Sequence, residues 1–173
     1  MKYMMNLMIL FVLGLISSQT HAQDWVQRLE VQGGRSYMDN TGTPTVFLEA
    51  LGPQTSWGGL HVQQDVSLGY IKGRHMSRFA LAHPGVGDPI FLGAWGGRFQ
   101  AGDETSWFHP VFFSFQGALH TGKTQALSST YEFVETLGWE AKRWSVAIRH
   151  ISNGSLHEPN RGETMFVVGM RLD

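Results

Sequence analysis

The chain has 173 residues, a formal net charge of −1 and no cysteine. The near-neutral charge gives no footprint for binding nucleic acid or another polyanion, and the absence of cysteine excludes disulfides and thiolate metal sites. The 21 glycines and the aromatic content of 12% suit many tight turns between strands that carry large side chains. The composition therefore favours a β-rich protein.

Residues 1–22 have the pattern of a secretory signal peptide. Lys2 precedes an apolar run from Met8 to Ile16, and Thr20-His21-Ala22 forms a small-residue processing site. A core helix is the alternative, but the basic start and the small-residue end fit export better. Cleavage after Ala22 would leave residues 23–173, which form one domain by length.

Apolar and polar residues alternate in most of the remaining chain. The pattern is clearest from residue 60 to residue 70, where the apolar positions Leu60, Val62, Val66, Leu68 and Tyr70 share one face. Such alternation is typical of a strand with one apolar and one polar face. In chain order the expected strands are 24–35, 45–51, 60–70, 74–82, 90–100, 107–115, 129–139, 144–152 and 164–172. They predict a barrel of about eight strands, whose interior side chains can fill.

The environment of this barrel decides which way its apolar faces point. No stretch after residue 22 approaches the roughly 20 apolar residues of a membrane helix, so a membrane form would have to cross with strands. The apolar phase would face lipid in an outer-membrane barrel, whereas it would face the core in a soluble one. Asp65, Arg74, Arg78, Glu132 and Arg149 are expected to pair inside the barrel as structural groups.

The stretch from His150 to Glu163 carries the residue types of a hydrolytic site. In a strand, residues i and i+2 project from the same face, so His150 and Ser152 are expected side by side. An imidazole in that place can take the proton of the serine hydroxyl, which is a weak nucleophile without a base. A third group must orient the imidazole, and Glu163 and Glu158 are the nearby candidates.

The residues after the serine suit an oxyanion site. Asn153 and Gly154 can leave the strand because glycine tolerates positive φ, and backbone N–H groups released from the ladder can stabilise an oxyanion. The ordinary alternative for the whole stretch is a strand-to-loop exit that is rich in turn residues.

Strand parity places His150 and Ser152 in the apolar phase of the expected strand 144–152. The other members of that phase are Trp144, Val146 and Ile148. In a soluble barrel the pair would be enclosed, whereas in an outer-membrane barrel it would face lipid and act on a molecule already in the membrane. The same alternation turns Glu163 away from His150, unless a bulge or turn beside Gly162 re-aims its side chain.

Two motifs carry a resemblance to a known family. The specific motif is His150-Ile151-Ser152-Asn153-Gly154, followed by Pro159-Asn160-Arg161-Gly162 and an acidic residue, and the weaker one runs from Ser128 to Phe133. On these residues the chain resembles the PagL-type lipid A 3-O-deacylases. The resemblance implies an all-β fold, namely an eight-stranded antiparallel transmembrane β-barrel in the bacterial outer membrane, with residues 23–173 as its deacylase domain.

The resemblance also implies a reaction and its residues. Ser152 would be the nucleophile, His150 the base, and the backbone around Asn153 and Gly154 the oxyanion hole. The reaction would be hydrolysis of the ester-linked 3-hydroxyacyl chain at position 3 of lipid A, at the outer-leaflet face of the wall. In the family form the acid lies two residues after the glycine, where this chain has Thr164. Here Glu163 follows the glycine directly and is the expected third member of the triad.

The alternative is a barrel without enzymatic activity, either a structural outer-membrane protein or an exported soluble barrel that holds an apolar ligand. A soluble barrel would appear in a periplasmic extract, whereas a membrane one would require detergent. The histidines outside the motif lack the spacing of metal ligands, and neither a metal nor a cofactor is expected. The sequence leaves open whether the protein is a monomer or a homodimer.

Overall fold

The computed structural model describes residues 25–38, 41–74, 87–158 and 161–172. In chain order its strands are β1 (Arg28–Met38), β2 (Thr41–Leu51), β3 (Thr55–Trp57), β4 (Leu60–Ile71), β5 (Ile90–Ala101), β6 (Val111–Thr121), β7 (Tyr131–Glu140), β8 (Trp144–Ser152) and β9 (Glu163–Arg171). The expected signal peptide and all but the first residue of the expected strand 74–82 lie outside the described residues. Among the residues described, no helix is both long and apolar enough to cross a membrane.

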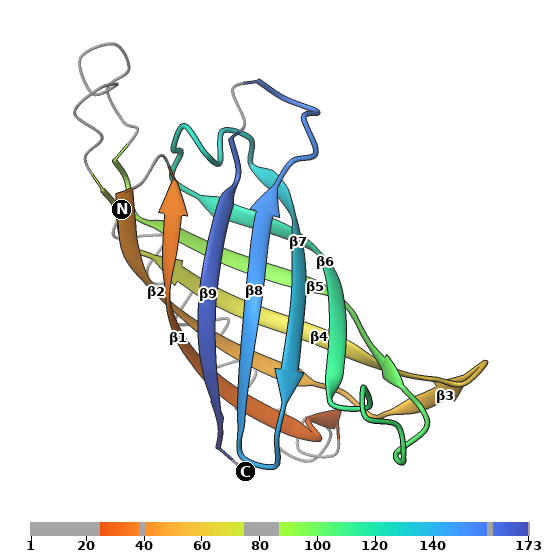
Figure 1. Cartoon of the computed structure of the whole chain (residues 1–173). Coiled ribbons are helices and arrows are strands. Elements are labelled where there is room, and N and C mark those ends of the chain that lie inside the picture. Colours follow the sequence, from red (N-terminus) through yellow and green to blue (C-terminus); the bar gives the residue numbers. More distant parts are fainter. Residues whose placement is uncertain (1–24, 39–40, 75–86, 159–160, 173) are drawn as a thin grey trace.

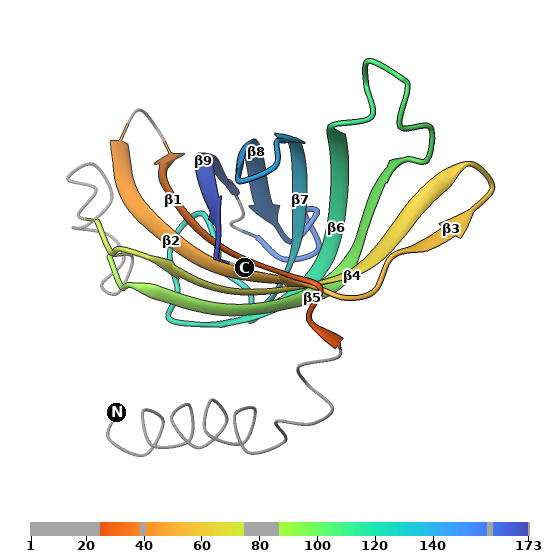
Figure 2. The same ribbon diagram turned by 90° about the horizontal axis from the view of Figure 1, so that it is seen from below.

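Antiparallel pairing closes these strands into a barrel. β1 pairs with β2 on one side and β9 on the other, and β2 also pairs with β4. The short β3 pairs with the far end of β4 and continues the line of β2 beyond the break at Gly52 and Pro53. With β2 and β3 sharing one position, the wall has eight positions and curves around its interior (Figures 1 and 2). The predicted eight-stranded antiparallel barrel is confirmed.

The interior is polar and its charged groups are paired. Glu49 accepts hydrogen bonds from Arg98, from Arg149 at 2.5 Å and from Gln32 at 2.8 Å. The guanidinium of Arg98 also lies 3.9 Å from the ring centre of Phe112. A polar interior is typical of transmembrane barrels. It does not suit the soluble barrel with an apolar ligand inside.

The expected interior charges lie where the alternation placed them. Asp65 accepts a hydrogen bond from Ser114 at 2.5 Å, and Glu132 accepts one from Ser129 at 2.8 Å. Both carboxylates are buried. Arg149 joins the Glu49 network, and Arg74 pairs with Glu163. Arg78 lies outside the described residues.

The outer wall is apolar. Large exposed side chains on it include Leu48, Leu68, Phe91, Trp95, Phe113, Phe115, Leu119, Leu137, Trp139, Trp144, Ile148, Phe166, Val168 and Met170. An outward apolar band of this kind is the lipid-facing surface of a membrane barrel. A side chain that points outward from a strand of this barrel therefore lies in an apolar environment.

Candidate active site

Arg149 faces the barrel interior, and its direction fixes which way the neighbouring side chains of β8 point. Its Nη2 donates to Glu49 and its Nε donates to Thr136 Oγ1 at 2.9 Å. Because side chains alternate along β8, this anchoring turns the residues on either side of Arg149 outward. His150 and Ser152 therefore lie together on the outer face, while Ile151 between them is buried. Their predicted placement in the lipid-facing phase is confirmed.

The imidazole of His150 is held by the neighbouring strand β9. Cross-strand pairing sets His150 opposite Thr164, and the His150 Nδ1 and Thr164 Oγ1 atoms are 2.9 Å apart. The other edge of the ring lies against Gly162, where an added Cβ would come within 2.6 Å of Cε1 and 2.9 Å of Nε2. Gly162 also has a φ of +66°, which glycine adopts most readily. Two features of this position thus require glycine.

The structure does not bring Glu163, the expected third member of the triad, to His150. Glu163 pairs with Ile151 across the β8–β9 ladder, so its side chain points into the barrel. There it is buried, accepts a hydrogen bond from Ser36 and forms an ion pair with Arg74. No bulge re-aims it, because the β8–β9 register is continuous from Trp144 to Ile151. Thr164 holds the place beside the imidazole.

The second acidic candidate, Glu158, lies in the loop after β8. Its side chain is exposed, and it forms no hydrogen bond or ion pair with His150. Neither candidate acid therefore contacts the imidazole in this structure.

Ser152 is half-buried at the end of β8, next to Phe133 of β7. Its hydroxyl makes no hydrogen bond within the described residues, in contrast to the bonded serines of the interior. Catalytic hydrogen bonds are often long in free enzymes and tighten when substrate binds. The hydroxyl is thus available for chemistry on the outer face.

The chain turns sharply after Ser152. Gly154 and Ser155 both have a φ of +63°, in the left-handed region. Asn153 is buried, and its Nδ2 donates to Ser129 Oγ at 3.0 Å and to the carbonyl of His157 at 2.9 Å. The Asn153 side chain therefore holds the turn in shape, and any oxyanion contact from this segment has to come from its backbone.

The weaker motif, Ser128 to Phe133, anchors this turn to the neighbouring strand. Ser129 Oγ accepts the bond from Asn153 and lies 2.6 Å from the carbonyl oxygen of Tyr131, while Ser128 Oγ lies 3.2 Å from His157 Nδ1. The turn is thus attached at two points to the segment that opens β7. The sequence suggested that these residues belong together, but only the structure shows what they do.

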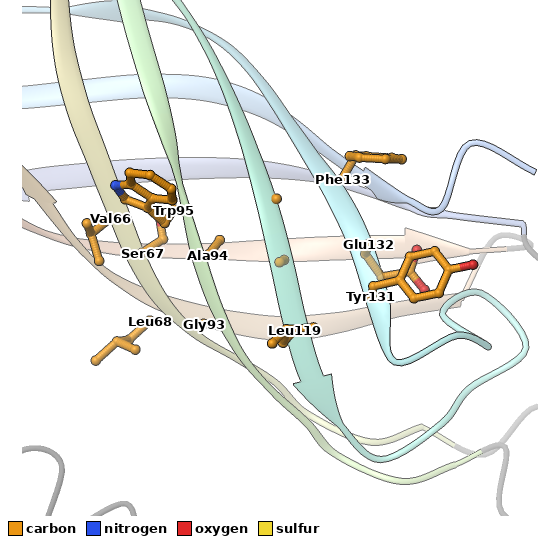
Figure 3. A pocket seen from close by; sticks show the side chains of 12 residues that line it. Val66, Ser67, Leu68, Gly93, Ala94, Trp95, Leu119, Tyr131, Glu132 and Phe133 are labelled. Carbon is orange, nitrogen blue, oxygen red and sulfur yellow. The ribbon is translucent and has the colours of Figure 1, made fainter. Parts of the chain in front are cut away.

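A groove on the outer wall begins one strand away from Ser152. It has a volume of about 480 Å³, and most of its outward lining is apolar: Val66, Leu68, Trp95, Leu119, Tyr131 and Phe133 (Figure 3). Gly93 lies between Leu68 and Leu119, and Gly117 lies between Trp95 and Phe133. The missing side chains of these two glycines create the hollow, since a Cβ at Gly117 would meet nothing within 4 Å.

The groove is continuous with the surroundings of Ser152 through Phe133. Phe133 lines the groove and is the β7 partner of Ser152. A Cβ added to Gly154 would be 3.8 Å from the Phe133 ring, so the turn also rests beside it. Sequence reasoning missed this groove, although outward-facing glycines among large apolar residues are a signal for one.

Comparison with known proteins assigns this barrel to a family. No curated protein is significantly similar to the chain. Among solved structures, the crystal structure of the outer membrane enzyme PagL matches with a TM-score of 0.51 and 14% sequence identity, covering 84% of this chain and 99% of that one. That match supports the fold. The family model described as lipid A 3-O-deacylase (PagL) matches residues 52–173. The chain therefore belongs to the PagL family of lipid A 3-O-deacylases.

Proposed function

We propose that this lipid A 3-O-deacylase of the outer membrane uses Ser152 as its nucleophile and His150 as its general base. The observation that carries the proposal is the placement of both side chains on the lipid-facing wall, beside an apolar groove. A lipid substrate reaches this face without leaving the membrane. The reaction is hydrolysis of the ester that links a 3-hydroxyacyl chain to position 3 of lipid A.

In the first half of the reaction, Ser152 attacks the ester carbonyl carbon. The Oγ–H bond breaks, its proton passes to His150 Nε2, and a bond forms between Oγ and the carbonyl carbon. The carbonyl oxygen takes up the electron pair and becomes an oxyanion. When the oxyanion collapses, the bond to the sugar oxygen breaks and His150 protonates that oxygen, which leaves an acyl group on Ser152.

In the second half, water releases the acyl group. His150 accepts a proton from water as the water oxygen attacks the acyl carbon, and then returns the proton to Ser152 Oγ as the carbon–Oγ bond breaks. The products are a free 3-hydroxy fatty acid and a lipid with one acyl chain fewer.

Thr164 takes the orienting role that the sequence suggested for Glu163. In the proposed mechanism, Nδ1–H donates to Thr164 Oγ1, which lies 2.9 Å from Nδ1, and the lone pair of the imidazole is on Nε2. Gly162 leaves room for that edge of the ring. The group that orients His150 in the proposed site is therefore neutral.

The backbone N–H groups around Asn153 and Gly154 are the proposed oxyanion donors. The positive φ at Gly154 turns the chain out of the ladder directly after the nucleophile. Because Asn153 holds this turn through buried hydrogen bonds, its amides are positioned before substrate arrives, as electrostatic stabilisation requires.

The groove is the proposed seat of the acyl chain that is released. This chain is joined to the carbonyl that Ser152 attacks, and the groove opens at Phe133, the cross-strand neighbour of Ser152. The two longest connections between strands, at 72–89 and 153–162, follow β4 and β8 at this end of the barrel. In outer-membrane barrels the longer loops are extracellular, which sets the site toward the outer leaflet.

All of the proposed groups come from one chain, so the chemistry requires no homodimer. The signal peptide at 1–22 and the domain boundary at residue 23 stay predictions, and they are consistent with export to the outer membrane.

The test is mass spectrometry of lipid A from cells that express the parent chain or Ser152→Ala. We expect loss of one 3-hydroxyacyl group with the parent and a decrease in rate on the order of 10⁴-fold or more with the variant. Heat-dependent migration in gels confirms that both barrels are folded. Deacylation by a folded Ser152→Ala would refute the mechanism, and an unchanged lipid A with a well-inserted parent would favour a structural barrel.

A further inference from the structure

Apart from His150, Glu135 is the one acidic or basic side chain at the outward positions of β6, β7, β8 and β9. Its neighbours along β7, Val134 and Thr136, are buried, so Glu135 itself points outward. The other outward positions of these strands carry apolar or neutral polar residues and His150. A carboxylate on a lipid-facing wall carries an energetic cost. Its presence there calls for a physical reason.

The β-sheet register sets this carboxylate opposite the proposed base. Glu135 of β7 and His150 of β8 are direct cross-strand partners on the same face. Side chains in such pairs have Cβ atoms about 4.5–5.5 Å apart. Glu135 has no hydrogen bond or ion pair with any residue in the described part of the chain, and its β6 partner is the apolar Phe115. His150 is thus its polar cross-strand neighbour.

The other groups around His150 supply no negative charge. Thr164 on β9 is neutral, and Glu163 points inward to Arg74. Arg149 faces inward on β8 itself. In the loops, His157 contacts Ser128, Glu158 is exposed without contacting His150, and Arg161 is an exposed cation beside Gly162.

We propose that Glu135 is a positioning residue that stabilises the charged form of His150 from the β7 side. This inference rests on the proposed function. When Ser152 transfers its proton, the imidazole becomes a cation, and in a triad an acid compensates that charge. In this chain the two tasks of that acid are divided, because Thr164 orients the ring while Glu135 supplies the charge. The low dielectric of the lipid-facing wall strengthens the interaction between the two side chains.

The test compares the parent with Glu135→Gln, which keeps the shape and removes the charge. We expect kcat to fall on the order of tenfold while KM stays unchanged, because Glu135 acts on the imidazole and not on the substrate. The Glu135→Gln barrel should fold as well as the parent, because the substitution removes a charge from the lipid-facing wall.

A second variant distinguishes a charge effect from a structural one. Adding Thr164→Glu to Glu135→Gln places a carboxylate on the other side of His150, and we expect it to restore most of the lost kcat. A parent-like kcat in folded Glu135→Gln, with Ser152→Ala inactive, would overturn this inference and leave the proposed function intact. An active Ser152→Ala would overturn both.

Discussion

Both faces of β8 carry polar side chains, but those on the inner face make more hydrogen bonds than those on the outer face. On the inner face, Arg149 is bonded to Glu49 and Thr136, and Ser145 is bonded to Glu30 at 2.5 Å. On the outer face, His150 has one hydrogen bond and Ser152 has none within the described chain. Buried polar groups are almost always satisfied, so the inner set stabilises the barrel. On the outer face, the hydroxyl of Ser152 and Nε2 of His150 are available for chemistry.

Two acidic residues beside β8, Glu163 and Glu135, also differ according to the face on which they lie. Glu163 and Glu135 each stand one strand away from β8, on β9 and β7. Glu163 faces inward and its charge is matched by Arg74, whereas Glu135 faces outward beside His150. The face on which a carboxylate lies therefore says more about its role than its distance along the sequence from the nucleophile.

The largest effect is expected from a substitution on the inner face, where it should lower the stability of the barrel. Replacing Arg149 by Met removes a fully buried cation from Glu49, which keeps Arg98 as its remaining cation, so the variant should lose about 2–3 kcal/mol of stability. Denaturant unfolding of the refolded barrel measures the loss of stability. Ile148→Ala, on the outer face of the same strand, is the control and should cost much less. Equal losses would mean that the two faces do not differ in their structural role.

A smaller effect is expected in the groove. Gly117→Leu fills the space between Trp95 and Phe133, so the kcat/KM ratio for long over short 3-O-acyl chains should fall on the order of tenfold. Gly33→Leu is the matched control, because a side chain there also meets nothing within 4 Å and lies outward on β1. Assays with lipid A analogues of graded chain length test this. An unchanged preference would show that the acyl chain lies elsewhere.

The smallest effect is expected at Thr164. Thr164→Val keeps the volume and removes the hydroxyl that bonds His150 Nδ1, so kcat should fall about threefold to tenfold, as expected for one neutral hydrogen bond. Thr164→Ser restores the hydroxyl and should restore activity. Steady-state deacylation assays measure both variants. If the valine variant were fully active, Glu135 alone would have to position the imidazole.

Much of this architecture follows from alternation along the chain. The period-two pattern located the strands around β4, β5, β7, β8 and β9 to within a few residues, and it placed His150 and Ser152 outward. These predictions succeed because the side chains of a strand alternate strictly between two faces and lipid admits few polar groups on one of them.

The sequence alone determined that this chain is a barrel with His150 and Ser152 on its apolar face. Only the tertiary structure decided which residues surround that pair. Thr164, Glu135 and Phe133 reach the site through hydrogen-bonding register with β9 and β7, and Glu163 is withdrawn from it by the same register. Parity is a local property that can be read along one strand, whereas register depends on closure of the whole barrel.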